Sequence, residues 1–481
     1  MPEPESDLVA SARGEEGRAA RPFSWRFTVP LLLGSALNPI NSSLIATALI
    51  PIAAGLHVRV GQTAALVTGL YLASAVAQPT AGKAAQVFGP RRVFLTGIVL
   101  VAAGGTVGGL AQDLTTLLIS RVLIGLGTSC AYPTAMLLIR GRAYDAGLDE
   151  PPGNVLGALQ IAGTATASLG LPVGGVLVGA LTWRSVFFVN VPVALIALAA
   201  TLAWIPRDHP VGRDRTLSGV ASALDVTGIL GFGATMTALL VFLYDLPVAH
   251  WYLLGIAVAA GAALAVWELR AATPFLDVRL LAAHRALTRT YLRFGLVMLC
   301  VYVVLYGLTQ WTEAVRGLSE SEAGLLLLPM TLVSALVIAP VSRRNLVRGP
   351  LIAAALMCVA GSAGVLLLTS STWIGLVVAI TVVFGISMGA ASAGNQTALY
   401  DQAPPQQLGT ASGLLRTFAY MGSIASSAIT GIVFHTHVTD HGLHLIAWIM
   451  VGISAALIVM TVADRSLYPR NPENSRACHR R

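Results

Sequence analysis

The chain of 481 residues carries 55% hydrophobic and only 11% charged residues, and its mean hydropathy is +0.75. A water-soluble domain needs far more polar surface than this composition supplies, so a soluble globular protein is excluded. The net charge of +8 would favour a nucleic-acid partner in a soluble protein. Here, however, the basic residues stand in short loops beside apolar stretches. We therefore expect them to contact anionic lipid headgroups, and we expect no nucleic-acid partner.

The N-terminal segment, residues 1–26, is polar and includes five acidic side chains. It lacks a short apolar core followed by a small-residue cleavage site, which a secretory signal peptide would have. We therefore expect a cytoplasmic tail, and we expect the first apolar stretch to remain in the protein.

Apolar stretches of membrane-spanning length follow one another from Phe27 to Ala463. A helix needs about 20 apolar residues to cross a hydrocarbon core of about 30 Å, because every backbone amide must be paired where water is absent. On that criterion the sequence predicts an all-α polytopic membrane protein with fourteen spans: 27–50, 61–81, 91–111, 115–139, 154–181, 185–205, 225–246, 251–270, 287–310, 321–342, 348–369, 373–398, 408–434 and 442–463.

The distribution of basic residues predicts the orientation. With the N-terminus inside, 25 of the 30 Lys and Arg residues fall in inside segments and only three in outside loops. Short cytoplasmic loops retain Lys and Arg, so both termini should be cytoplasmic in a multi-pass protein of the plasma or inner membrane.

The spans group as six, two and six. The longest polar stretch between spans has about 20 residues, whereas a soluble domain usually needs 50 or more, so all function should reside in the helix bundle and its loops. Two repeated halves around a midplane site are the expected architecture of secondary transporters. The predicted division is an N-terminal tail (1–26), a six-helix half (27–205), linkers with two extra helices (206–286), a second six-helix half (287–463) and a C-terminal tail (464–481).

Amides, hydroxyls and aromatic side chains within the spans are candidates for a substrate path. The first span alone holds Asn38, Asn41 and Ser42 beside Pro39, which should loosen the helix. Such residues are too polar to face lipid, although any single one can simply form an interhelical hydrogen bond. The candidates are Asn38, Asn41, Ser42, Gln160, Gln310, Trp311, Asn395, Gln396 and Tyr420.

Two arginines stand inside predicted spans, Arg121 in the fourth and Arg416 in the thirteenth. An ionisable group there costs roughly 2.5–3.5 kcal/mol, so it is a functional candidate by default. Arg121 either faces a polar cavity, with Gly125 keeping its surroundings narrow, or extends to the outer interface. For Arg416, nearer the cytoplasmic end, interface and function are equal alternatives.

Small residues within the spans should pack helices against one another. Pairs such as Gly409 and Gly413 let backbones approach closely in lipid. The four cysteines also read as packing residues, because none is placed to form an extracellular disulfide: Cys130, Cys300, Cys358 and Cys478.

Patterns of enzymes are missing from the sequence. It contains no nucleophile elbow, no zinc-ligand spacing and no P-loop, and its glycine-rich stretches lie in apolar spans. We therefore expect neither an enzyme nor an ATP-driven pump, and no metal or cofactor.

Several motifs resemble the major facilitator superfamily, and more closely its fourteen-span drug:proton antiporter branch. The segment between spans two and three looks like the superfamily signature: Gly82-Lys83-Ala84-Ala85-Gln86-Val87-Phe88-Gly89-Pro90-Arg91-Arg92. Matches typical of the branch occur at Trp183-Arg184-Ser185-Val186-Phe187-Phe188-Val189-Asn190-Val191-Pro192, Leu224-Asp225-Val226-Thr227-Gly228, Pro274-Phe275-Leu276-Asp277-Val278-Arg279, and Gly317-Leu318-Ser319.

The resemblance implies a major facilitator fold and assigns roles to residues. Arg121 with Gly125 is similar to the fourth-span motif in which the arginine takes part in proton transfer. Signature residues implied in gating are Gly82, Gly89, Arg91 and Arg92, and residues implied in an antiporter-like bend are Gly170, Pro172, Gly174 and Gly175. The chain departs from the pattern in having Gln86 where the signature has an acid, and Asn41-Ser42-Ser43 where the branch has a first-span aspartate.

Together these features predict a monomeric transporter that exports small amphipathic or cationic compounds by alternating access, with protons as the coupling ion. Within transport, the alternatives are an exporter of an endogenous metabolite or lipid and an uncoupled facilitator. A membrane sensor or scaffold that has lost transport is the alternative from another class, and it would explain the missing carboxylates.

Overall fold

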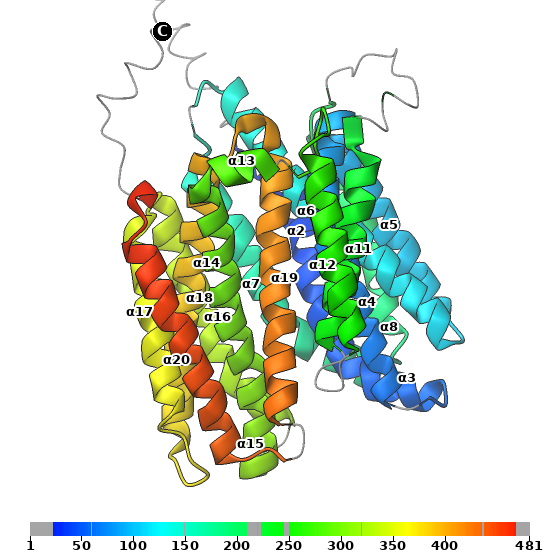
Figure 1. The fold of residues 1–481 in the computed structure, drawn as a ribbon. Coiled ribbons are helices and arrows are strands. Elements are labelled where there is room, and N and C mark those ends of the chain that lie inside the picture. The colour runs from blue at the N-terminus through cyan, green and yellow to red at the C-terminus, as the bar shows by residue number, and fades with distance from the viewer. Residues whose placement is uncertain are drawn as a thin grey trace, which may run out of the picture.

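A computed structural model describes residues 23–58, 60–148, 150–208, 219, 223–244, 250–276, 278–318, 320–434 and 437–467. In these ranges the chain is helical and contains no strand (Figure 1). The predicted all-α class is confirmed. Most of both predicted tails, including Cys478, lies outside the described residues.

The first half of the chain forms one body of the molecule (Figure 1). Its helices, in chain order, are α2 Trp25–Leu44, the 3-10 turn η1 Ile45–Ala48, α3 Leu49–Gly55, α4 Val60–Phe88, α5 Pro90–Leu110, α6 Leu114–Asp145, α7 Gly153–Ala180, α8 Ser185–Phe188 and α9 Asn190–Trp204.

The second body follows two additional helices, α11 Val226–Tyr244 and α12 Trp251–Glu268, and the short α13 Val278–Ala283. Its helices are α14 Arg285–Val303, the π-helical turn η2 Val304–Leu308, α15 Thr309–Arg316, α16 Glu320–Arg343, α17 Arg348–Val365, α18 Ile374–Gln402, η3 Pro405–Gln407, α19 Leu408–Val433, α20 Asp440–Val462 and η4 Arg465–Leu467.

Among the described residues, eleven helices are long and apolar enough to cross a membrane, or twelve if the bent α7 counts as one span. The long helices α4 and α19 are not among them. Both carry amides, hydroxyls or charge on the faces that meet each other, and this lowers their hydropathy. The count of fourteen spans therefore stays a prediction.

Three of the helices continue well beyond the predicted ends of their spans. The helix predicted to stop at 81 continues to Phe88, that predicted to stop at 139 continues to Asp145, and that predicted to stop at 310 continues through α15 to Arg316. A hydropathy criterion stops at the edge of the hydrocarbon, whereas a helix continues into water wherever its backbone bonds are made.

Buried apolar side chains divide along with the two bodies. One cluster runs through the second body around Met298 and Phe384, whereas separate clusters fill the first body around Phe94 and Phe187. Each body therefore has its own core. The predicted limits of the halves stay a prediction.

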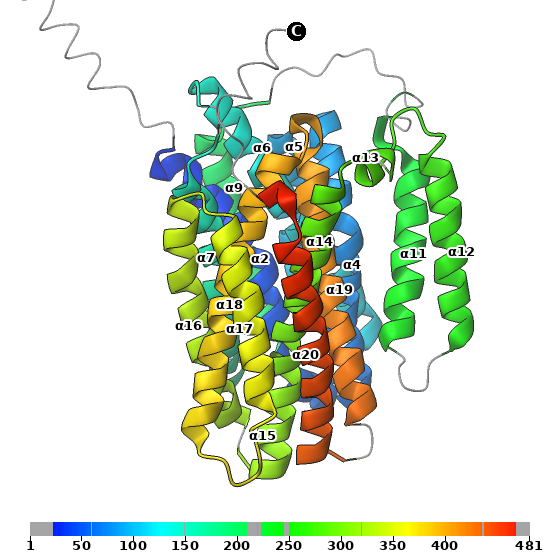
Figure 2. The same ribbon diagram turned by 60° about the vertical axis from the view of Figure 1, so that its left-hand side comes forward.

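The helices α11 and α12 stand beside the bundle, with α11 next to α4 and α19 and α12 on its outer side (Figure 2). Much of their apolar surface is exposed, including Trp251 at 70% and Val258 at 65%. In a membrane this surface faces lipid.

We call one end of the bundle the basic end, because it carries the basic residues of the short connections. The turn between α4 and α5, the connection between α6 and α7, and α13 all lie there (Figure 1). Its arginines include Arg91, Arg92, Arg140, Arg142, Arg343 and Arg344.

Candidate functional site: a polar seam between the halves

Asn38 of α2 is the centre of a hydrogen-bonded group that joins the two bodies. Its Nδ2 donates to Ser74 Oγ at 3.0 Å and to Thr128 Oγ1 at 2.9 Å. Tyr420 of α19 donates its hydroxyl to Asn38 Oδ1 at 2.8 Å and accepts from Gln78 Nε2 at 2.8 Å. One tyrosine of the second body is thus bound by two amides of the first.

A second group lies nearer the basic end. Gln160 Nε2 of α7 donates to the Tyr132 hydroxyl and to Gln396 Oε1, both at 3.0 Å, and Tyr132 also donates to Gln396. Arg416 Nη2 donates to Gln160 Oε1 at 3.1 Å, and its guanidinium lies 4.2 Å from the Tyr132 ring centroid. These contacts again cross between the halves.

Helical periodicity places these side chains. Members of the two groups occur four residues apart on one face of α4, α6 and α19, so each helix presents two of them in the same direction. The pairs are Ser74 with Gln78, Thr128 with Tyr132, and Arg416 with Tyr420. We name the whole set the polar seam, consisting of Asn38, Ser74, Gln78, Thr128, Tyr132, Gln160, Gln396, Arg416 and Tyr420.

Glycines close the bundle around the seam at its basic end. A Cβ on Gly82 would overlap the backbone of Gly409 and Thr410, and a Cβ on Gly413 would overlap Gln78. The start of α7 is similarly tight, because a Cβ on Gly153 would overlap Ser342 of α16. The halves therefore meet backbone to backbone at the basic end.

The signature segment is anchored by a carboxylate that the motif did not indicate. Asp208 accepts hydrogen bonds from the backbone amides of Arg91 at 3.0 Å and Arg92 at 2.9 Å, at the start of α5. Gly89 precedes them with φ +98°, where a Cβ would overlap the Asp208 carboxylate. A carboxylate beside a helix N-terminus is stabilising there. Gln86 reaches across to Thr410 Oγ1 at 3.4 Å.

Arg121 is 1% exposed and lies inside the first body. Its Nε donates to the backbone carbonyl of Leu66 at 3.1 Å, and both terminal nitrogens lie 3.3 Å from the carbonyl of Asn41. The alternative of an arginine extending to the interface is therefore wrong. Gly125 packs closely, because a Cβ there would stand 2.9 Å from Ala73.

Asn41 lies near the seam but is bound elsewhere, and Ser42 contacts only the backbone of a seam residue. Asn41 is 1% exposed, and its Nδ2 donates to Asn190 Oδ1 at 2.6 Å and to the Leu37 carbonyl at 2.8 Å. The Ser42 hydroxyl donates to the Asn38 carbonyl at 3.0 Å. The first span changes to a 3-10 turn at Ile45–Ala48 rather than at Pro39.

Three predicted path residues lie apart from the seam. Asn395 accepts from Arg293 Nε at 3.0 Å inside the second body, and the buried Trp311 indole donates to Asp440 at 2.9 Å. Gln310 is exposed. A role of these three residues in the substrate path stays a prediction, because they do not lie together with the seam residues.

The helix α7 bends where the antiporter-like motif stands. Its segments Gly153–Ala167 and Pro172–Ala180 meet at 44°. At the bend a Cβ on Gly170 would overlap Ser43 of α2, and just beyond it a Cβ on Gly174 would stand 2.5 Å from Thr47. Gly175 has nothing within 4 Å of such a Cβ. The motif thus combines a tight contact with α2 and an open face.

Ser74, Thr128 and Tyr132 are the seam residues that the sequence interpretation missed, and Arg416 is the one it left undecided. A signal for Tyr132 and Arg416 was present in the spacing. Tyr132 follows Arg121, Gly125 and Thr128 on the same face of α6, and Arg416 precedes Tyr420 by one turn.

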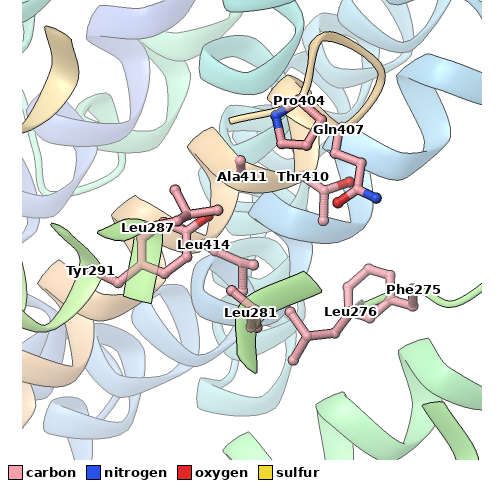
Figure 3. A pocket seen from close by; sticks show the side chains of 10 residues that line it. All are labelled: Phe275, Leu276, Leu281, Leu287, Tyr291, Pro404, Gln407, Thr410, Ala411 and Leu414. Atoms are coloured by element: carbon pink, nitrogen blue, oxygen red, sulfur yellow. The ribbon is translucent and has the colours of Figure 1, made fainter. Parts of the chain in front are cut away.

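A small cavity lies at the basic end between α14, α19 and the segment before α13 (Figure 3). Its volume is about 20 Å³, and its lining includes Phe275, Leu287, Tyr291 and Leu414. That volume suits a water molecule and is far below that of a drug-sized compound. The cavity is therefore not a substrate site in this conformation.

Two helical bodies with separate cores and a hydrogen-bonded seam define a polytopic membrane protein of the transporter type. The family model of the Major Facilitator Superfamily matches residues 31–427, and the chain belongs to that family. Members are multi-pass transporters of small molecules rather than enzymes. The predicted family is confirmed.

Relatives match over nearly the whole chain. The uncharacterized MFS-type transporter YwoD of Bacillus subtilis is 31% identical, with 92% of this chain and 97% of the relative covered. The tetracenomycin C resistance and export protein of Streptomyces glaucescens is 28% identical, with 91% and 80% covered. Several drug-resistance proteins among the relatives support drug efflux at the level of the family.

Solved structures share the fold. The human organic anion transporter MFSD10 superposes with a TM-score of 0.63 at 15% identity, covering 91% of this chain and 99% of that one. The proton:xylose symporter XylE gives a TM-score of 0.61 at 14% identity, covering 91% and 95%.

Proposed function

We propose that this protein exports small amphipathic or cationic compounds by alternating access, driven by proton antiport. It acts as a monomer in the plasma or inner membrane, with the basic end and both termini in the cytoplasm. The names of its resistance and export relatives support this choice of substrate, and the basic residues of one end support the orientation.

The polar seam is the observation that carries the proposal. It joins the halves through hydrogen bonds of side chains, most of them neutral, and each such bond contributes only about 0.5–1.5 kcal/mol net. Water can replace the partners when the halves part, so the seam is suited to break and reform. The tight glycine contacts at the basic end make this conformation the one closed to the cytoplasm.

Tyrosines beside the seam suit a cationic, partly apolar substrate. The Tyr71 and Tyr420 rings lie 5.8 Å apart, and the Tyr302 and Tyr306 rings lie 5.7 Å apart. Tyrosine faces attract cations, with about 0.5–2 kcal/mol per contact. Tyr306 stands in the π-helical turn η2, and such turns occur frequently at functional sites.

Proton coupling is assigned to the first body. Arg121 is buried against the backbone carbonyls of Leu66 and Asn41, so a change in its hydrogen bonds acts directly on α4 and α2. The bend of α7 against Ser43 and Thr47 would limit leakage along α2. The segment from Gly82 to Arg92 would hold the basic end closed until the halves move.

The experiment measures efflux of a fluorescent cation from cells, or its uptake into inverted vesicles, with and without an uncoupler. The proposed function predicts that the uncoupler abolishes efflux. Flux that the uncoupler does not change would support the facilitator instead, and no flux at all would support a sensor or scaffold.

A matched pair of variants tests the seam. Tyr420→Phe removes the hydroxyl that Asn38 and Gln78 share and should reduce efflux by about tenfold. Tyr252→Phe makes the same change on the exposed surface of α12 and should leave efflux unchanged. Equal activity of both variants would contradict a role of the seam.

A further inference from the structure

Two sequence motifs outside the transport path meet at the basic end of α11 and α12. The first motif contains Asp225, just before α11, and the second contains Phe275 and Leu276, between α12 and α13. Between them in sequence stands Glu268, the last residue of α12. This junction lies at the tip of the two helices that stand beside the bundle (Figure 2).

The hydrogen bonds at the junction differ between its two carboxylates. Asp225 accepts from the backbone amides of Gly228 and Phe275, both at 3.0 Å, and from the Trp267 indole at 2.8 Å. Glu268 accepts at Oε1 from the backbone amide of Leu276 at 3.1 Å. Its second oxygen, Oε2, is buried and has no hydrogen-bond partner among the described residues.

The carboxylates are close together and shielded from water. Asp225 is 6% exposed and Glu268 is 2% exposed. A Cβ on Gly228 would overlap one oxygen of each carboxylate, which explains why this position of the motif is a glycine. The carboxylates therefore converge on the same small space.

The charged groups that act on Glu268 are Asp225 and Lys83. Lys83 belongs to α4 and donates its ammonium to the Pro274 carbonyl at 2.9 Å. Arg279 of α13 bonds to the Leu269 carbonyl, next to Glu268 in the chain. Two adjacent buried carboxylates resist being ionised together.

We propose that the Asp225–Glu268 pair is a proton-binding site separate from the transport path, with the proton on Glu268 in this conformation. Asp225 already accepts from three donors, whereas Glu268 has a buried oxygen without a hydrogen-bond partner that can carry the proton. Loss of the proton adds a second negative charge to the pair.

The site is placed to act on the closure of the basic end. Lys83, which holds the 274–276 segment through Pro274, is adjacent to Gly82, and Gly82 forms the tight contact with Gly409. Repulsion between the carboxylates would loosen the 274–276 segment and weaken its hydrogen bond to Lys83 of α4. The two additional helices thereby make closure of the basic end dependent on cytoplasmic pH.

Infrared difference spectroscopy of the full-length protein in lipid nanodiscs tests the proton directly. We expect a carbonyl band of a protonated carboxylic acid at neutral pH that Glu268→Gln removes. The matched control, Glu150→Gln, changes an exposed glutamate at the same end and should keep the band. Identical spectra of native protein and Glu268→Gln would overturn the proposal.

Hydrogen–deuterium exchange tests the consequence. Between pH 6 and 8, after correction for intrinsic exchange, opening of the 270–276 segment should increase by up to about tenfold for each pH unit, because opening is linked to loss of one proton. Glu268→Gln should show the slow exchange at every pH. A pH dependence that persists in Glu268→Gln would show that another group controls the segment.

Discussion

Replacement of Gly82 by alanine should move the protein toward a conformation whose basic end is open. The added Cβ would overlap the backbone of Gly409 and Thr410, which cannot turn aside as a flexible side chain can. The conformation closed at the basic end is therefore destabilised, whereas one in which α4 and α19 separate is not.

The general cost of overpacking gives the size of this effect. Overpacking a close contact typically costs about 1–3 kcal/mol. If that cost falls only on the closed conformation, the ratio of open to closed molecules rises by about 5- to 150-fold. Gly141→Ala is the control, because a Cβ on this exposed glycine of α6 meets nothing within 4 Å.

The assay is double electron–electron resonance between spin labels at Asp145→Cys and Gln406→Cys, in a background without the native cysteines. These exposed positions stand at the basic end, one in each half. Gly82→Ala should enlarge the population with long distances, and Gly141→Ala should not. The same distance distribution in both variants would refute the idea that Gly82 and Gly409 close this end.

Three further outcomes are expected. Arg121→Ala should abolish coupled transport at near-normal expression. Arg121→Lys should fail too, because a lysine has no planar guanidinium to reach both carbonyls. Transport measured in vesicles checks this, and full activity of the alanine variant would refute it. Asn41→Ala should leave the buried Oδ1 of Asn190 without its donor and reduce the free energy of unfolding by about 1–3 kcal/mol, which a lowered denaturation midpoint would show and an unchanged one would contradict. Burial favours a raised pKa of Asp464, but hydrogen bonds from Ser466 and Arg289 outweigh it and hold that pKa below 3.8. The ionised Asp464 therefore stabilises the fold above about pH 4, and this stabilisation is lost as the pH falls through the lower pKa of the folded state. Thermal unfolding should show less acid destabilisation in Asp464→Asn than in the native protein. Equal acid profiles of the two proteins would count against this pairing.

The sequence predicted the helices well because the membrane imposes a simple rule on them. Long apolar stretches had to be helical, and glycines such as Gly409 and Gly413 had to meet a neighbouring backbone. Amides such as Asn38 and Gln160 were recognised as unsuited to lipid, and the structure brings both into the seam.

The sequence could not predict which partner each buried polar side chain bonds to. Asn395 and Gln396 are adjacent on α18, yet Gln396 joins the seam while Asn395 binds Arg293 within its own half. A rotation of about 100° per residue separates them, and hydropathy cannot tell which face meets the other half. The partner of Trp311 was out of reach of any local pattern as well, since Asp440 stands 129 residues away.

Proton movement driven by substrate is the most direct test of the central claim. Proteoliposomes containing the purified protein and an internal pH indicator would receive a cationic substrate at zero initial pH gradient. Proton antiport predicts that the interior becomes more alkaline as the substrate enters, because protons leave in exchange. This change should disappear in Arg121→Ala. Substrate uptake with no accompanying pH change would contradict the account.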